Sequence, residues 1–266
     1  MDLRPHSNEW YDRLAQLQKG YFYPWKSTIG PGDGETAFVN LVEAHLAPTV
    51  DVLDVGCGHG DLALSLAARC RTITGYDRVG EFIRLATQAA QASGTANATF
   101  IHADSSPRAN RGAARIPTES NAFDLVISRR GPLHGIADAR RVCRPGAVLI
   151  QLNPACDGPP VWDGQLPPQI RLQERAVNVE ETIRRSLRDA GLTLHSCWRF
   201  DVPEWFDDPQ ELYVRLAWGR DPQDIPPFQQ VKQAIESVFA QHAGPRGLVL
   251  RHQRFLWKAT ATTSRL

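Results

Sequence analysis

Short apolar runs alternate with amphipathic segments through the middle of the chain. Apolar, β-branched runs fall at residues 50–55, 72–77, 98–104, 123–128 and 147–152, and each predicts a buried strand. The segments between them predict helices at residues 61–70, 79–93 and 136–144, because their apolar residues recur at helical spacing. Strands that alternate with helices in this way predict a parallel sheet covered by helices on both faces.

The pattern changes after residue 153. Residues 153–169 contain five prolines and two glycines, which predicts an irregular loop. A helix over 179–192, a strand over 193–202, a helical insertion over about 207–244 and a last strand over 247–260 follow. We expect this whole stretch to belong to one domain that runs from residue 50 to residue 266.

The first 49 residues form a separate segment in this interpretation. Two helices are predicted around residues 8–18 and 34–46, and an aromatic stretch, "KGYFYPWKSTIGPGDG", joins them. This N-terminal helical segment lies either as a flap across the carboxyl edge of the sheet or as a layer packed for stability. The pattern does not distinguish the two.

Composition narrows the classes of partner. The 266 residues carry a formal net charge of +1, so no overall field draws the protein to nucleic acid or to an anionic membrane. No apolar run reaches the ~20 residues of a membrane span, and no apolar leader follows the first methionine. The five cysteines form no C-x-x-C pair, which predicts a cytoplasmic protein without disulfides or a metal site.

A glycine-rich turn follows the first central strand. The sequence "VDVLDVGCGHG" places Gly56, Gly58 and Gly60 where an open α/β sheet binds a nucleotide. The phosphate-binding string GxxxxGK[ST] does not occur in the sequence, and the dinucleotide pattern GxGxxG fails because its last position is Asp61. The turn therefore predicts a ligand other than a nucleotide phosphate.

Three carboxylates mark the ends of neighbouring strands. Asp54 precedes the glycines by two positions, where a carboxylate disfavours a pyrophosphate and favours an ammonium or sulfonium. Asp77 lies 21 residues beyond Gly56, a spacing that suits a carboxylate bound to ribose hydroxyls. Asp104 ends the third strand and is placed to accept a hydrogen bond from an adenine amine. These acids together predict S-adenosylmethionine as the ligand.

These motifs, in this order, resemble the class I S-adenosylmethionine-dependent methyltransferases. "VLDVGCGHG" is similar to motif I of that family, "GYD" to motif II, "HAD" to motif III and "FDLVIS" to motif IV. "RRVCRPGAVLI" resembles the helix, turn and strand that follow, so that the resemblance covers about residues 35–155. It implies a doubly wound, seven-stranded, Rossmann-like α/β sheet with an antiparallel last strand.

The cofactor site follows from the motifs and their immediate neighbours. We expect it to contain Asp54, Gly56, Cys57, Gly58, Gly60, Asp77, Arg78, Asp104, Ser105 and Ser128. Alternatives stay open for the acids: Asp77 is also a favoured helix cap, and Asp104 can form a turn with its own neighbours. For Cys57 we expect only a small side chain whose backbone faces the ligand.

No catalytic residue is assigned. A sulfonium is an activated leaving group, so methyl transfer needs alignment and shelter more than a base. The segment after the fourth strand, "SRRGPLHG", lacks the [DN]PP[YF] motif of nucleobase amine methyltransferases. Arg129 and Arg130 are candidates to hold an acidic substrate, His134 is a candidate base, and Cys156 is a weak candidate nucleophile.

The sequence thus predicts an S-adenosylmethionine-dependent methyltransferase that acts on a small molecule. An RNA or protein methyltransferase is the first alternative, since "RANRGAAR" and the arginines over 129–144 supply local positive charge. A relative that binds the cofactor without turnover is the second. The acceptor, the atom methylated and the oligomeric state are not determined by the sequence.

Overall fold

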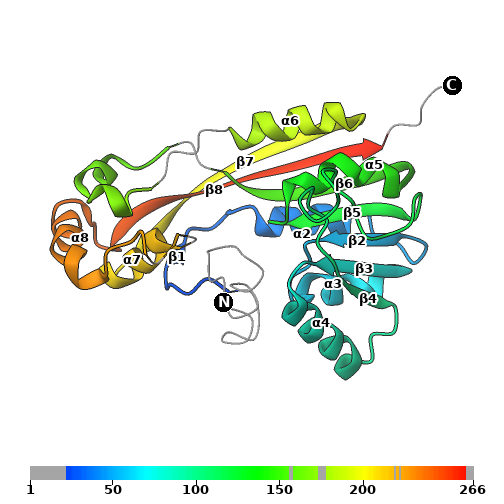
Figure 1. Cartoon of the computed structure of the whole chain (residues 1–266), viewed down its shortest axis with the longest axis horizontal. Coiled ribbons are helices and arrows are strands. Elements are labelled where there is room, and N and C mark those ends of the chain that lie inside the picture. Colours follow the sequence, from blue (N-terminus) through cyan, green and yellow to red (C-terminus); the bar gives the residue numbers. More distant parts are fainter. Residues whose placement is uncertain (1–21, 156–157, 173–177, 219, 222, 262–266) are drawn as a thin grey trace.

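The computed structural model describes residues 22–155, 158–172, 178–218, 220–221 and 223–261. Eight strands form one mixed sheet in the order β1-β7-β8-β6-β5-β2-β3-β4 (Figure 1). Their bounds are β1 Thr28–Ile29, β2 Asp51–Val55, β3 Thr72–Asp77, β4 Ala98–His102, β5 Phe123–Arg129, β6 Cys143–Ala155, β7 Leu192–Phe206 and β8 Leu248–Ala261. No described helix has the length and apolar character that crossing a lipid bilayer demands.

The parallel half of the sheet comprises β6, β5, β2, β3 and β4. All five residues of β2 are buried, as a central strand with helices on both faces requires. Its side chains alternate, so that Val52 packs with α2 and α3 while Leu53 packs with α5 and α6. The helices are α2 Glu35–Glu43, α3 Asp61–Leu66, α4 Gly80–Ser93, α5 Ile136–Val142 and α6 Val179–Asp189.

The antiparallel half extends far beyond the parallel half. β8 lies between β6 and β7 and is antiparallel to both, and the two long strands reach the helices α7 Pro209–Ala217 and α8 Phe228–His242 (Figure 1). A separate apolar cluster forms at that end, with Phe206 and Leu248 from the strands and Leu212 and Ile235 from the helices. The 3₁₀ segments Val161–Gln165 and Pro168–Ile170 also contribute to it.

The structure confirms the predicted α/β architecture and the antiparallel last strand, with one difference in strand number. The eighth strand is β1, whose two residues pair with β7, and a run that short carries no periodic signal. The segment over 153–169 is less irregular than expected, because β6 continues to Ala155 and two 3₁₀ segments follow.

The N-terminal segment is described only from residue 22. Its second predicted helix is present as α2, and Phe38 and Val42 pack into the core beneath the sheet. The helix predicted over 8–18 lies outside the described residues, as does Cys156. The domain boundary at residue 49 stays a prediction.

Candidate functional site

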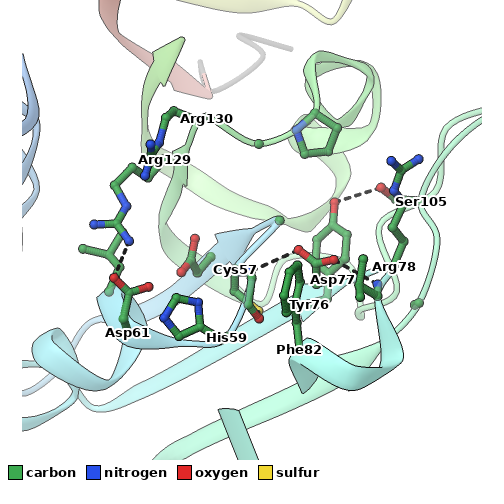
Figure 2. A pocket seen from close by; sticks show the side chains of 18 of the residues that line it. Cys57, His59, Asp61, Tyr76, Asp77, Arg78, Phe82, Ser105, Arg129 and Arg130 are labelled. Atoms are coloured by element: carbon green, nitrogen blue, oxygen red, sulfur yellow. Dashed lines mark hydrogen bonds and ion pairs between the residues drawn. The ribbon is translucent and has the colours of Figure 1, made fainter. Parts of the chain in front are cut away.

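A cavity of about 550 Å³ opens at the carboxyl ends of β2, β3, β4 and β5. Figure 2 shows the Arg129–Asp61 pair at one side of it and Asp77, Arg78 and Ser105 at the other. Eight of the ten residues expected in the cofactor site line it, namely Asp54, Gly56, Cys57, Gly58, Asp77, Arg78, Asp104 and Ser105. Gly60 and Ser128 are not among the lining residues.

The glycine turn brings bare backbone to the cavity wall. Gly58 has φ +56°, and a Cβ added there would meet no atom within 4 Å. Gly60 instead faces the protein interior, because its Cβ would lie 2.8 Å from Cβ of Ala86 and 2.9 Å from the ring of Phe100. Gly58 therefore leaves room for a ligand, whereas Gly60 leaves room for a helix.

Asp77 connects the glycine turn to α4. Its Oδ2 accepts a hydrogen bond from the amide of Gly58 at 3.0 Å, and its Oδ1 accepts one from the amide of Val79 at 2.9 Å. Burial raises the pKa of Asp77, and these two amides act against that rise. Asp77 does not cap α4, because the helix begins at Gly80 and has no side-chain capping hydrogen bond. Each of its carboxylate oxygens can still accept a further hydrogen bond in the cavity.

A short hydrogen-bond chain closes the cavity beside β4. The hydroxyl of Tyr76 donates to Oγ of Ser105 at 3.0 Å, and that oxygen lies 2.9 Å from Nε2 of His134. Asp104 Oδ1 accepts from the amide of Ser106 at 2.8 Å, the local turn left open from the sequence. Burial lowers the pKa of His134. Its position beside β3 and β4 separates it from Arg129 and Arg130 at the end of β5.

Asp54 is the most unusual group in the cavity. It is 2% exposed, and within the part of the chain that the structure describes its Oδ2 has no hydrogen-bond partner. Burial raises its pKa to about 7, although the positive charge of Arg129 acts in the opposite direction. Arg129 itself donates to Oδ2 of Asp61 at 2.5 Å. A buried carboxylate of this kind is neutralised by a proton or paired with a cation.

Two further residues of the predicted site have structural contacts. The Cys57 side chain packs where a Cβ on Gly75 would lie, 2.8 Å from Sγ, and burial raises the pKa of its thiol well above the usual value. Ser128 Oγ donates to the carbonyl of Val55 at 2.7 Å, which fixes β5 to the end of β2.

Sequence reasoning missed several lining side chains. They are Phe22, His59, Asp61, Leu62, Tyr76, Val79 and Phe82. Most stand next to a motif residue in sequence, so adjacency was the available signal. Phe22 pairs with His59 at 5.5 Å between ring centroids, a contact that no local pattern encodes.

Comparison with known proteins finds similarity to methyltransferases. A family described as a methyltransferase domain matches residues 52–146. The 23S rRNA (uracil(1939)-C(5))-methyltransferase RlmD of Tolumonas auensis is 32% identical over 121 residues, which cover 44% of this chain and 27% of that protein. The demethylmenaquinone methyltransferase of Lactiplantibacillus plantarum is 30% identical over 135 residues, 46% of this chain and 54% of that one.

The similarity to these curated relatives is therefore partial, and the chain spans between about a quarter and about half of their lengths. A solved structure agrees over more of the chain. The putative methyltransferase of Bacillus halodurans superposes with a TM-score of 0.60 at 16% identity, over 88% of this chain and 100% of that one. At that identity the likeness concerns the fold. Residues 52–146 are thus similar to a methyltransferase domain, and the sheet shares the Rossmann-like fold of this solved structure.

Proposed function

We propose that this protein transfers a methyl group from S-adenosylmethionine to a small-molecule acceptor. The observation that carries the proposal is Asp54, a buried carboxylate whose Oδ2 lacks a partner among the described residues and which stands beside a bare-backbone turn. An ammonium group is the natural complement to such an oxygen, and a phosphate is not.

The residues of the cavity fit the other parts of that cofactor. Asp77, at the end of β3, has lone pairs left for ribose hydroxyls after its two backbone contacts. Asp104 and Ser105, which follow β4, are assigned to the adenine side. Gly58 allows the ligand to approach the backbone closely. When bound, the cofactor supplies an electrophilic methyl group on a sulfonium.

The protein contributes position and shelter in this proposal. The cavity walls include the rings of Phe22, Tyr23 and Phe82, which exclude water from the reacting atoms. His134 is held against Ser105 at the adenine side, so we do not assign it as the base. Alignment of acceptor and methyl group is the contribution that an activated leaving group needs most.

The small-molecule assignment rests on charge and on the cavity walls. The net charge of +1 gives no general attraction to RNA phosphates, and the aromatic walls suit an apolar body. One relative is named as a methyltransferase of demethylmenaquinone, a small molecule. The RlmD relative carries an RNA in its name, but the match covers only 27% of that protein.

A radiolabelled methyl-transfer assay tests the proposal. The protein is incubated with S-adenosylmethionine labelled on the methyl group and with separate pools of small metabolites and total RNA. We expect label in the metabolite pool, and none with the Gly58→Val variant. Label in RNA alone, with a steep loss at higher salt, would support the RNA alternative. Cofactor binding without transfer to either pool would support a relative without turnover.

A further inference from the structure

Two buried polar side chains lie on one face of β8, outside the cofactor cavity. His252 and Arg254 are each 7% exposed. Nε2 of His252 and Nε of Arg254 have no hydrogen-bond partner in the described ranges of the chain. Burying such nitrogen atoms without partners is costly, so in native proteins a bound water, an ion or a ligand commonly satisfies them.

The ring of His252 is oriented from one side. Its Nδ1 lies 3.5 Å from Oε2 of Glu204 on β7. Glu204 is itself 4% exposed and is fixed by the hydroxyl of Ser27, which donates to Oε1 at 2.7 Å, and by Nε1 of Trp25 at 3.2 Å. These contacts direct the second ring nitrogen of His252 away from Glu204.

Arg254 has little support from the described side chains around it. Its Nη1 donates to the carbonyl of Gln253 at 3.3 Å, and none of the ion pairs between described residues includes it. Tyr23 and the carboxylates Glu35 and Asp33 favour its charge, and the nearby charge of Arg130 opposes it. Glu35 lies 3.6 Å from Arg130, and Asp33 accepts a hydrogen bond from the amide of Glu35.

Strand register places Arg254 near the carboxyl edge of the sheet. Arg129 pairs with Leu152 and Leu152 pairs with Leu256, which defines one row across β5, β6 and β8. Arg254 pairs with Pro154, two residues beyond that row and roughly 7 Å closer to the carboxyl edge. The cavity opens at the same edge.

The order of strands indicates which part of the reaction mixture the two side chains could contact, namely the acceptor. The adenine and ribose acids follow β4 and β3, and the ammonium-side acid lies on β2. Beyond β5 the next strands along this edge are β6 and β8, so the acceptor is expected there. Tyr23 connects the two regions: it lines the cavity and stacks on Trp25 at 4.4 Å, and Trp25 contacts Glu204.

We propose that Arg254 binds an anionic group of the methyl acceptor, a carboxylate or a phosphate, with Nε2 of His252 as a second hydrogen-bonding atom. A guanidinium offers parallel N–H donors that match either anion. This proposal rests on the proposed methyltransferase function. The anion bound by Arg254 is identified as part of the methyl acceptor only if the cavity holds the cofactor.

Calorimetric titration of the protein saturated with S-adenosylhomocysteine tests the subsite. The probes are benzoate, phenyl phosphate and the neutral benzamide, at constant ionic strength. We expect at least one anion to bind about tenfold more tightly than benzamide, and Arg254→Met to remove that preference. His252→Gln should weaken the same anion by a smaller factor. The tighter of the two anions identifies carboxylate or phosphate as the group recognised.

Arg251→Met is the matched control. Arg251 is on the same strand, three positions away, but its side chain is exposed and pairs with Asp201. This variant should bind all three probes as the wild type does. Equal binding of benzoate, phenyl phosphate and benzamide, or an unchanged preference in Arg254→Met, would overturn the proposal.

A thermal melt without ligand separates a binding role from a structural one. Removal of a buried charge that has no ion-pair partner among the described residues should leave Tm of Arg254→Met equal to or above that of the wild type. A Tm several degrees lower would mean that Arg254 supports the fold instead. Failure of S-adenosylhomocysteine to bind, with Arg254-dependent anion binding intact, would refute the cofactor assignment but not the anion site.

Discussion

Strand β2 has an aspartate near each end, and the two carboxylates differ in their hydrogen-bond partners. Asp51 begins the strand and Asp54 stands three residues later, and both are buried, at 7% and 2% exposure. Asp51 accepts hydrogen bonds from Nε of Arg71 at 2.8 Å, from the hydroxyl of Thr72 at 2.7 Å and from Nη2 of Arg144 at 2.7 Å. Asp54 Oδ2 accepts none from the described residues.

The difference appears in the pKa values of the two carboxyls. The hydrogen bond from Arg71 holds the pKa of Asp51 well below its usual range, whereas burial raises the pKa of Asp54 to about 7. The amino edge of the sheet is therefore complete within the protein itself. At the carboxyl edge the Asp54 carboxylate keeps an oxygen without a partner among the described residues, and the proposed function assigns a bound cation to it. A functional site departs from optimal stability in this way.

The largest expected effect on cofactor affinity comes from a side chain that fills the cavity at Gly58. Gly58→Val should weaken S-adenosylhomocysteine binding by more than about 100-fold, because a branched side chain would occupy the space before the backbone. Gly94→Val is the matched control, since Gly94 also has a positive φ and open space around its Cβ position but lies at the end of α4. Both variants should lose similar stability in a thermal melt. Normal binding by Gly58→Val would place the ligand elsewhere.

A substitution at the amino edge of the sheet should lower the stability of the protein and leave its affinity for the cofactor unchanged. Asp51→Ala leaves Arg71 and Arg144 without their shared carboxylate, so we expect the free energy of unfolding to fall by about 2 kcal/mol. Urea denaturation measures this loss. Calorimetry on the folded variant should give wild-type affinity for S-adenosylhomocysteine. A large change in affinity with unchanged stability would reverse the roles assigned to the two edges.

Asp77 tests the neighbouring strand. Asp77→Ala removes the acceptor expected for the ribose hydroxyls, and we expect affinity for the cofactor to fall by more than about tenfold with the fold intact. Asp104→Ala should cost less, about threefold, because part of its carboxylate serves the local turn. Circular dichroism controls for folding. Unchanged affinity in the Asp77 variant would refute its assignment.

The pH dependence of binding isolates Asp54. A cation binds the ionised carboxylate, and with a pKa of about 7 that form is abundant at pH 8 and scarce at pH 6. Affinity for S-adenosylmethionine should therefore fall about tenfold from pH 8 to pH 6, and Asp54→Asn should flatten the profile. A flat profile in the wild type would contradict the role of Asp54.

The pKa of Asp54 also predicts how stability depends on pH, and the direction is opposite to that of cofactor affinity. Its pKa in the folded protein is raised above the unfolded value of about 3.9, so its contribution to stability is present below pH 4 and is lost as the pH rises towards 7. Asp54→Asn should consequently raise Tm at pH 8 and leave it unchanged at pH 4, as measured by calorimetric melting.

The parallel half of the fold could be predicted because its signals are local. The strand at 50–55, the glycine turn and the acids at 77 and 104 lie within short, periodic stretches. Which side of a turn a residue faces is not local. The Cβ position of Gly60 faces Ala86 and Phe100, and the hydroxyl of Ser128 donates to the carbonyl of Val55. Neither residue lines the cavity, although both belong to the expected motifs.

The antiparallel half could not be derived in the same detail. Glu204 meets His252 across 48 positions and Trp25 across 179, and only strand register brings them together. Glu204 and His252 are also buried, whereas charged residues usually stay at the surface. Arg254 is buried in the same way, although the sequence around it predicts only an ordinary strand.

Calorimetric titration of the unmodified protein with S-adenosylmethionine, S-adenosylhomocysteine, ATP and NAD tests the central claim most directly. Carboxylates at the ends of adjacent strands should select the cationic adenosine compound, so we expect both S-adenosyl ligands to bind and both phosphorylated nucleotides to bind at least about 100-fold more weakly. Tighter binding of ATP or NAD than of S-adenosylmethionine would contradict the account.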